Sequence, residues 1–448
     1  MLTVVAGILG TTGDWQRVGV SPSVPAYLDL AQITYSAGCT LPGAGQVGDT
    51  TCDPVGRPYN YPPIWAAAAR LLGVDAHDTV WLGGLLAAVG LAALALFQVR
   101  FAGRPTAGRI AVLTAVTCSP PMLLLIARGN IDLVMLALLV AGAGLVVSGR
   151  NSWAAAVIAC AAGLKLFPVG GLLSLRRRPA VIGGLLSAVA ILVLDGRWLG
   201  AIRAATPSAV TDSFGVGVLP SVARHVDSSS VASLDLGSIP SRLPVLPVLP
   251  VDQAAGLTLF ATLYAGLLLT RTGRRAVGAA TASLRRDHVS TTAFLVGAGP
   301  FLVSYLLTNS FDYRLAPLLF VAVACLRTDV RALHGLTAGL VVVFWAEVTA
   351  TPAQLVGDVA LCAVAPCIAA VATLLVLERW GLRPGSAFLG RLQWGLGAGT
   401  GVRPAEHLAN DEAPPVPAGS HSVDRGHQVA RLHAPSPPPP ARRWPTHP

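Results

Sequence analysis

Apolar stretches long enough to form membrane helices recur along most of the chain, separated by short polar connections. A helix needs roughly 17 to 25 such residues to cross a hydrocarbon core about 30 Å thick. The pattern therefore predicts an all-α protein, a polytopic transmembrane helical bundle with about 10–12 membrane segments. The expected segments lie near residues 79–99, 109–127, 131–148, 152–175, 179–194, 254–270, 289–307, 314–326, 332–350 and 358–378.

The two ends of the chain depart from this pattern. Residues 1–10 are apolar but would span only about 15 Å as a helix. We interpret them as the end of a first membrane helix whose beginning is missing, with a short signal region as the alternative. Beyond about residue 379 the chain is polar and rich in proline, which is typical of a disordered tail. We therefore expect a truncated first span with an extracytoplasmic loop (1–78), a helical domain with an outer loop at 195–253 (79–378), and a disordered cytoplasmic tail (379–448).

Clustered arginines occupy several of the connections, which the positive-inside rule assigns to the cytoplasm. If every apolar stretch crossed the membrane once, the rule would fail for the first loop and for the connection at 100–109. One segment must therefore cross an even number of times. The arginines are Arg100, Arg104, Arg109, Arg176, Arg177, Arg178, Arg271, Arg274, Arg275, Arg285, Arg286, Arg327 and Arg331.

The segment 152–175 is the best candidate because Lys165 and Pro168 interrupt it. Proline disfavours a continuous helix and restricts the residue that precedes it. A broken, re-entrant hairpin with Lys165 at its outer tip would place every arginine cluster inside and the first loop outside. One long tilted helix, with the Lys165 ammonium reaching the interface, is the alternative.

Composition narrows the class of protein. The sequence is 53% hydrophobic and 12% charged, with a mean hydropathy of +0.62. An ordinary soluble domain has about a quarter of its residues charged, so this class is excluded. The net charge of +10 would suit nucleic acid, but the arginines lie in short clusters without interleaved aromatic residues. We therefore expect no nucleic-acid partner.

The seven cysteines indicate where disulfide or metal chemistry could occur. Cys39 and Cys52 share the first polar loop, so we expect a disulfide there if that loop faces an oxidising compartment. The others lie in apolar segments, where cysteine usually acts as a small hydrophobic residue. The sequence has neither a CxxC nor an HExxH motif, and we expect no metal site and no cofactor.

Short polar motifs mark the ends of segments that should face outside. The simplest interpretation of the run CDPVGRPYNYPPIW (52–65) is an interfacial aromatic anchor, but an anchor does not need Asp53 and Arg57. Similarly, Arg128 and Arg314 could merely extend to the interface beside nearby aspartates. The remaining motifs are YLDLAQITY with Asp29, RGNID (128–132), GLKLFP (163–168) and NSFDYR (309–314).

Together and in this order, the motifs resemble those of GT-C glycosyltransferases, particularly the polyprenol-phosphate-mannose-dependent mannosyltransferase-like family. The resemblance covers roughly residues 1–378. It implies an integral membrane enzyme that transfers a sugar from a polyprenyl-phosphate donor to a glycolipid or glycan acceptor of the cell envelope. Mannose is the sugar that the resemblance favours. The transfer would proceed with inversion, at the extracytoplasmic face of the plasma membrane.

The resemblance also suggests roles for individual residues. Asp29 corresponds to the first-loop aspartate that takes the proton from the acceptor hydroxyl, and Asp53 is the competing candidate for this general base. Arg128, Lys165 and Arg314 should bind the donor phosphate, whose developing charge needs fixed cations. We expect the substrates to contact Arg57, Tyr59, Asn60, Tyr61, Asn130, Asp132 and Asp312.

A monophosphate leaving group does not require a divalent ion, and the loops hold no DxD-type pair. We therefore expect a metal-independent reaction. A transporter or flippase of lipid-linked sugars is the main alternative function. Transporters commonly have repeats with interrupted helices in matching positions, whereas this sequence has one interrupted segment and no evident repeat. A non-catalytic membrane scaffold, with its proline-rich tail binding a partner, is a further alternative.

Overall fold

The computed structural model describes residues 25–194, 201–202, 205, 213–220, 251–307, 310–328, 330–346 and 351–382. The chain divides into two units, Met1–Ser386 and Ala387–Pro448, and every described residue belongs to the first. The expectations for residues 1–10, for most of the outer loop and for nearly all of the tail therefore lie outside the described residues.

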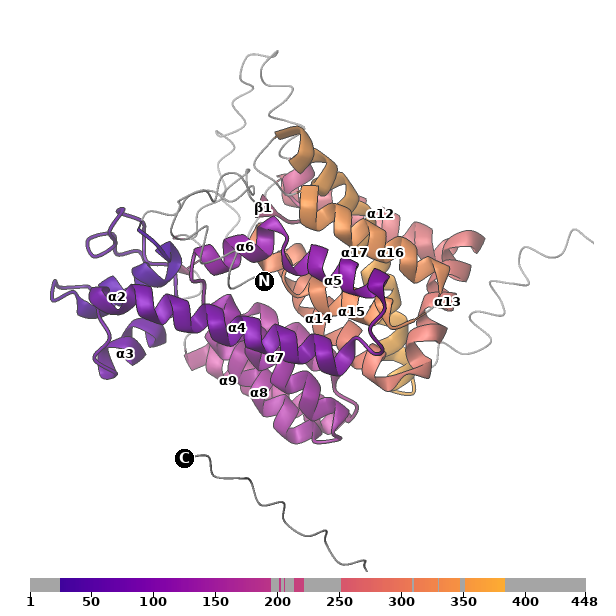
Figure 1. Ribbon diagram of the computed structural model, residues 1–448, viewed down its shortest axis with the longest axis horizontal. Helices are drawn as coiled ribbons and strands as arrows, with labels where there is room; N and C mark the ends of the chain where they lie inside the picture. The colour runs from indigo at the N-terminus through magenta and orange to yellow at the C-terminus, as the bar shows by residue number, and fades with distance from the viewer. Residues whose placement is uncertain are drawn as a thin grey trace, which may run out of the picture. The chain divides into compact units, whose positions relative to one another are not determined.

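The described residues form an all-α protein, which confirms the predicted class (Figure 1). Two short strands, β1 (Ser213–Phe214) and β2 (Ser310–Phe311), pair antiparallel. The α-helices are α2 (Leu28–Gly38), α3 (Pro63–Leu71), α4 (Thr79–Phe101), α5 (Ala107–Thr117), α6 (Pro120–Ala127), α7 (Asp132–Val147), α8 (Asn151–Leu164), α9 (Arg178–Leu194), α12 (Val251–Leu269), α13 (Arg271–Arg286), α14 (His288–Leu307), α15 (Leu318–Leu326), α16 (Arg331–Ala346) and α17 (Thr351–Arg379). The 3-10 helices are η2 (Ala76–Asp78), η3 (Phe167–Ser174) and η5 (Asp312–Leu315).

The apolar stretches are less uniform than the sequence suggested. Within the described residues, four helices are long and apolar enough to cross a membrane, namely α4 extended by η2, α12, α14 and most of α17. The pair α5 and α6 would make a fifth span, bent by 47°. Two consecutive prolines begin α6, and they account for the break because proline cannot continue the hydrogen-bond ladder of α5. The helices α7, α8, α9 and α16 are apolar but shorter.

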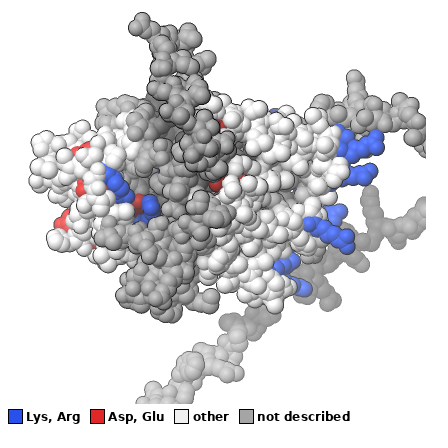
Figure 2. Space-filling model, turned by 90° about the horizontal axis from the view of Figure 1, so that it is seen from above, with Lys and Arg blue, Asp and Glu red and all other residues white. Residues whose placement is uncertain are grey.

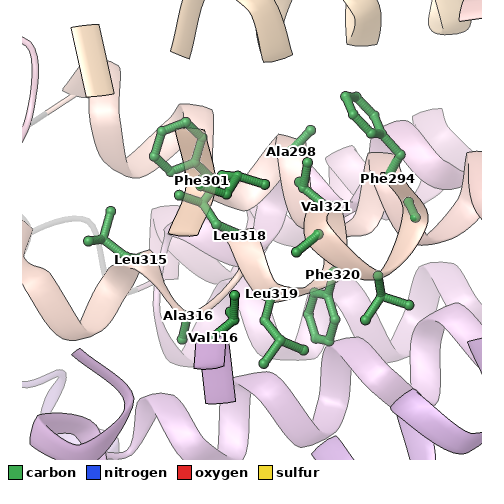
Figure 3. Packing of buried hydrophobic residues seen from close by; sticks show 14 of the residues in the cluster. Val116, Phe294, Ala298, Phe301, Leu315, Ala316, Leu318, Leu319, Phe320 and Val321 are labelled. Carbon is green, nitrogen blue, oxygen red and sulfur yellow. The ribbon is translucent and has the colours of Figure 1, made fainter. Parts of the chain in front are cut away.

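Helix α15 explains one difference between the prediction and the structure. It has only nine residues, and all of them from Leu318 to Cys325 are fully buried. In Figure 3 its side chains interdigitate with Phe294, Ala298 and Phe301 of α14. Burial of this apolar surface stabilises the protein core, so the stretch at 314–326 is an internal helix rather than a lipid-facing span.

The segment after α8 reverses direction, which confirms the predicted hairpin. The backbone of Lys165 is extended (φ −160°, ψ 130°) and ends α8 after 14 residues. The chain then returns through η3, and the Arg176 amide donates a hydrogen bond to Asn151 Oδ1 at 3.0 Å. The two ends of the hairpin therefore lie together, with Lys165 at the opposite tip.

The interior of the hairpin requires glycine. A Cβ atom on Gly170 would lie 2.2 Å from the carbonyl carbon of Gly299 on α14. The two backbones can approach this closely only because neither residue has a side chain. This contact holds the returning half of the hairpin against the core.

The arginine-rich connections meet at one end of the molecule. Arg327 pairs with Asp287 and donates to the Phe101 carbonyl, and Arg285 pairs with Glu378. Helix α4, about 34 Å long, extends from this end to the first loop. Figure 2 shows several lysine and arginine side chains gathered at one end, and acidic side chains together with a few basic ones toward the other. We call the first the basic end.

Candidate active site

The first loop is a small packed unit at the end opposite the basic end. Cys39 and Cys52 form a disulfide, as the sequence suggested. Tyr59 and Tyr61 pack edge to face with ring centroids 6.1 Å apart. Tyr59 is only 1% exposed, and burial raises the pKa of its hydroxyl above the ordinary value. Tyr59 therefore packs in the core of the loop, and its expected contact with a substrate stays a prediction.

Asp53 organises a turn in this loop. Its Oδ1 atom accepts hydrogen bonds from the backbone amides of Val55 (2.9 Å) and Arg57 (3.0 Å), and its Oδ2 atom pairs with the Arg57 guanidinium at 3.0 Å. Gly56 has φ 71°, the left-handed conformation that this turn requires. Asp53 thus holds the backbone and the side chain of Arg57 in place.

Arg57 connects this turn to Asp29. Its NH2 atom donates to the Leu28 carbonyl at 2.7 Å, and its NH1 atom lies 3.3 Å from Asp29 Oδ1. Burial alone would lower the pKa of Arg57, but the hydrogen bond with Asp53 and the charges of Asp29 and Asp53 outweigh it and raise the pKa. The guanidinium is therefore a permanent cation beside both carboxylates.

Asp29 lies at the start of α2, where three separate segments meet. Its backbone amide donates to the Arg128 carbonyl at 3.0 Å. Its Oδ2 atom accepts a hydrogen bond from Asn130 Nδ2 at 2.6 Å, and its Oδ1 atom lies 3.8 Å from Arg128 NH1. The carboxylate is thus held by Arg57, Arg128 and Asn130.

Tyr27 docks this helix on the rest of the protein, a role that sequence reasoning missed. It is a non-glycine residue with positive φ (56°), a strained conformation. A Cβ atom on Gly83 of α4 would lie 2.3 Å from Cδ2 of the Tyr27 ring, and one on Gly129 would lie 2.8 Å from Tyr27 Cβ. The tyrosine therefore fits against two glycines and places Asp29 beside Asn130. A glycine in each facing segment was the available sequence signal.

Asn130 links Asp29 to the second half of the site. It is fully buried, and its Oδ1 atom accepts hydrogen bonds from the Asp132 amide (2.9 Å) and from Lys165 Nζ (3.3 Å). These donors orient its Nδ2 atom toward the Asp29 carboxylate. The turn RGNID thereby joins a carboxylate from the first loop to the lysine at the tip of the hairpin.

Lys165 and Arg314 meet at Asp132. Lys165 Nζ lies 2.5 Å from Asp132 Oδ1 and 5.5 Å from the centre of the Tyr61 ring. Arg314 Nε lies 3.7 Å from Asp132 Oδ2. Trp65 Nε1 donates to the carbonyl of Leu164 at 3.3 Å, which ties the hairpin tip to the first loop.

Solvent exposure differs between the charges of this cluster. The cationic side chains are 13% to 27% exposed, whereas the carboxylates are 2% to 8% exposed. The surface that an incoming molecule meets is therefore cationic, with carboxylates behind it. The cations are Arg57, Arg128, Lys165 and Arg314, and the carboxylates are Asp29, Asp53 and Asp132.

The sequence model of glycosyltransferase family 87 matches residues 59–304, which is more than half of the chain. The chain belongs to glycosyltransferase family 87. No curated protein and no solved structure matches the sequence. It is therefore a GT-C-like membrane glycosyltransferase, with a sugar donor and an acceptor as its substrates.

In this family 87 enzyme the matched region includes both the RGNID turn and Lys165, whereas Asp29, Asp53, Arg57 and Arg314 lie outside it. Contacts in the structure join most of the predicted site residues into one cluster. Asp53 contacts the cluster through Arg57. Asn60 is half-buried and directly precedes Tyr61 in the chain. Asp312 is buried in η5, the turn that carries Arg314.

Among the residues that the structure describes, no three histidine, cysteine, aspartate or glutamate side chains lie together in a way that could hold a metal ion.

Proposed function

We propose that this glycosyltransferase transfers a sugar, with mannose as the first candidate, from a polyprenyl-phosphate donor to a glycolipid or glycan acceptor of the cell envelope, with inversion. The observation that carries this proposal is the buried carboxylate of Asp29 beside the outward-facing cations Arg128, Lys165 and Arg314. The two halves of this site are joined by Asn130.

The orientation follows from the charge distribution of the molecule. The arginine-rich connections meet at the basic end, which the positive-inside rule assigns to the cytoplasm. The site lies at the other end of α4 and would then face the extracytoplasmic side of the plasma membrane. The Cys39–Cys52 disulfide supports this orientation, since disulfides persist in oxidising compartments.

Asp29 is the better candidate for the general base. Each oxygen of Asp53 is used in the turn that it forms with Arg57, and the side chain is 2% exposed. Asp29 instead contacts groups from several segments of the site and adjoins its cations. A carboxylate in this position can take the proton of an acceptor hydroxyl as the oxygen attacks the anomeric carbon. Asp53 then acts by positioning Arg57.

The cations would stabilise the departing lipid phosphate. As the bond from the anomeric carbon to the phosphate oxygen breaks, negative charge accumulates on the phosphate, and fixed cations in a partly dry site lower the energy of that state. Lys165 reaches the site from the tip of a hairpin surrounded by apolar helices, which suits a donor that arrives from within the membrane. The four cationic side chains of the cluster could neutralise the charge on the phosphate without a divalent ion.

The other residues predicted to contact the substrates fall into two groups, those that could touch the sugar and those that hold the cations. Tyr61 and Asn130 lie within the cluster and could contact the sugar, and Asn60 is half-buried next to Tyr61. Asp132 acts by holding Lys165 and Arg314.

The decisive experiment measures sugar transfer by the purified full-length protein, with labelled polyprenyl-phosphomannose and an extract of envelope lipids as acceptor. We expect Asp29→Asn to reduce turnover by about 10²- to 10⁴-fold, the usual contribution of a general base, while donor binding is retained. Asp53→Asn should lower turnover far less, because it only loosens Arg57. The matched control is Asp49→Asn in the same loop, where the carboxylate accepts hydrogen bonds from Thr51.

Three results would contradict the proposal. Retained turnover in Asp29→Asn would exclude it as the base, and a rate that EDTA abolishes and magnesium or manganese restores would exclude the metal-free reaction. Scrambling of the lipid-linked sugar between leaflets without any transfer would support the transporter alternative instead. The anomeric configuration of the product, measured by NMR, tests inversion.

A further inference from the structure

A second group of basic side chains lies at the basic end, away from the candidate active site. Arg176 follows η3, His288 begins α14, and Arg379 ends α17. Arg178, two residues after Arg176, donates a hydrogen bond to the Trp380 carbonyl, so this connection lies beside the end of α17, and the charge of Arg176 acts on both His288 and Arg379. We call these three residues and Trp380 the basic-end site.

Like charges that act on one another are normally compensated by a carboxylate. Within the part of the chain that the structure describes, neither Arg176 nor Arg379 forms an ion pair. The acidic residues nearby are paired elsewhere, Asp287 with Arg327 and Glu378 with Arg285. The repulsion between the two guanidinium groups is therefore not compensated by a protein carboxylate.

Two donors of this site are buried without an acceptor among the described residues. They are NH1 of Arg379 and Nε1 of Trp380. Leaving a buried charged donor without a hydrogen bond is costly, so such groups usually have a partner in the functional state. Arg178 donates to the Trp380 carbonyl and thereby positions this residue beside the site.

We propose that Arg176, Arg379 and Trp380 bind the phosphate group of an anionic molecule, with an anionic phospholipid of the surrounding leaflet as its source. A phosphate neutralises the two guanidinium groups and has oxygens for both buried donors. Basic pockets between membrane helices on the cytoplasmic side bind such headgroups, and tryptophan is enriched at headgroup depth.

The position of the site gives the bound group a structural consequence. The backbone amide of Arg176 is hydrogen-bonded to Asn151 Oδ1, so Arg176 lies where the two ends of the hairpin meet. Arg379 is the last residue of α17. A phosphate that bridges the two arginines ties the base of the hairpin to α17, and the tip of that hairpin carries Lys165.

Thermal unfolding of the full-length protein in detergent tests this proposal. The protein is titrated with phosphatidylglycerol or with phosphatidylcholine of the same acyl chains, and separately with inorganic phosphate against chloride at equal ionic strength. We expect phosphatidylglycerol to raise the melting temperature more than phosphatidylcholine. Arg176→Gln and Arg379→Gln should each weaken its apparent affinity about tenfold, because each removes a charge-assisted hydrogen bond.

Two further variants make the test specific. Arg275→Gln removes an exposed arginine from α13 at the same end and should leave the lipid preference unchanged. Trp380→Phe removes the indole donor while keeping an aromatic ring, and it should weaken binding together with Arg176→Gln even if Arg379→Gln does not fold.

Each outcome has a defined meaning. Stabilisation by inorganic phosphate but not by phosphatidylglycerol would support the phosphate site and assign it to a free anion. Equal stabilisation by both lipids with no effect of phosphate would overturn the proposal, as would a loss of lipid preference in Arg275→Gln equal to that in Arg176→Gln.

Discussion

The ion pair between Lys165 and Asp132 permits a test that separates stability from catalysis. Lys165 lies at the tip of the hairpin, and Asp132 begins α7. We consider the single variant Lys165→Met and the double variant Lys165→Met with Asp132→Leu. Both keep the approximate volume of the side chains and remove the ammonium group.

The magnitude follows from distance and burial. The charged atoms are 2.5 Å apart, and the side chains are 13% (Lys165) and 3% (Asp132) exposed. At an effective dielectric constant of about 20 the attraction is about 7 kcal/mol before desolvation is subtracted. Removing one partner of a buried pair typically destabilises a protein by about 3–5 kcal/mol, whereas replacing both with apolar residues is often nearly neutral. In the double variant Arg314 also loses its ion pair with Asp132. The Arg314 side chain is 21% exposed, so water can partly solvate its charge.

The assay combines unfolding in mixed micelles with sugar transfer. Lys165→Met should lower the free energy of unfolding by about 3–5 kcal/mol, and the double variant should regain most of this loss. Transfer should fall by at least about 100-fold in both variants, because neither has the ammonium group that we propose stabilises the leaving phosphate. Recovery of transfer along with stability in the double variant would refute the proposed role of Lys165 and leave it a structural one.

Three further predictions concern the loop and the hairpin. Arg57→Lys should reduce transfer about tenfold, because lysine lacks the planar fork that contacts two carboxylates and a carbonyl at once. Replacing both Cys39 and Cys52 with serine should destabilise the loop by about 3 kcal/mol, since their separation of 13 residues closes a short loop in the unfolded chain; limited proteolysis and unfolding measure this. Gly170→Ala should destabilise the protein by at least about 1–3 kcal/mol, because the added methyl group would lie 2.2 Å from the Gly299 backbone.

Each of these predictions has a control. For the hairpin it is Gly183→Ala on α9, where an added Cβ atom has no neighbour within 4 Å, so this variant should keep or slightly raise the melting temperature. For the loop, a reductant should destabilise the parent protein and not the serine variant. An Arg57→Lys protein with full activity would show that the guanidinium fork is not needed to position Asp29.

Much of the fold could be inferred from hydrophobicity alone, since a helix that is surrounded by lipid and by the core of a membrane protein must be apolar on every side. Length and apolarity do not reveal which stretches face lipid, however. The stretch at 314–326 was expected to span the membrane, whereas α15 is enclosed by its neighbours. The interrupted segment at 152–175 was recognisable because a lysine and a proline break an apolar run, and their effect on a helix is local.

The candidate site was predictable as a set of motifs but not as an arrangement. Polar residues at the ends of apolar spans are rare enough to attract attention, which is why Asp29, Lys165 and Arg314 were identified. The docking of Tyr27 against Gly83 was not recognised, because a single glycine in an apolar segment does not reveal which distant side chain packs against it.

The sequence by itself determined that this is a helical membrane protein, that its charges are segregated along the chain, and which polar residues could carry chemistry. Only the tertiary structure distinguishes the surroundings of Asp53 from those of Asp29, two carboxylates of the same loop, and these surroundings are why we propose Asp29 as the base. Asp53 is bound by the backbone and the side chain of its own turn, whereas Asp29 meets groups from segments about 100 residues away. The physical reason is that composition and local chemistry act within a few residues, while the environment of a carboxylate depends on which distant segments packing brings to it.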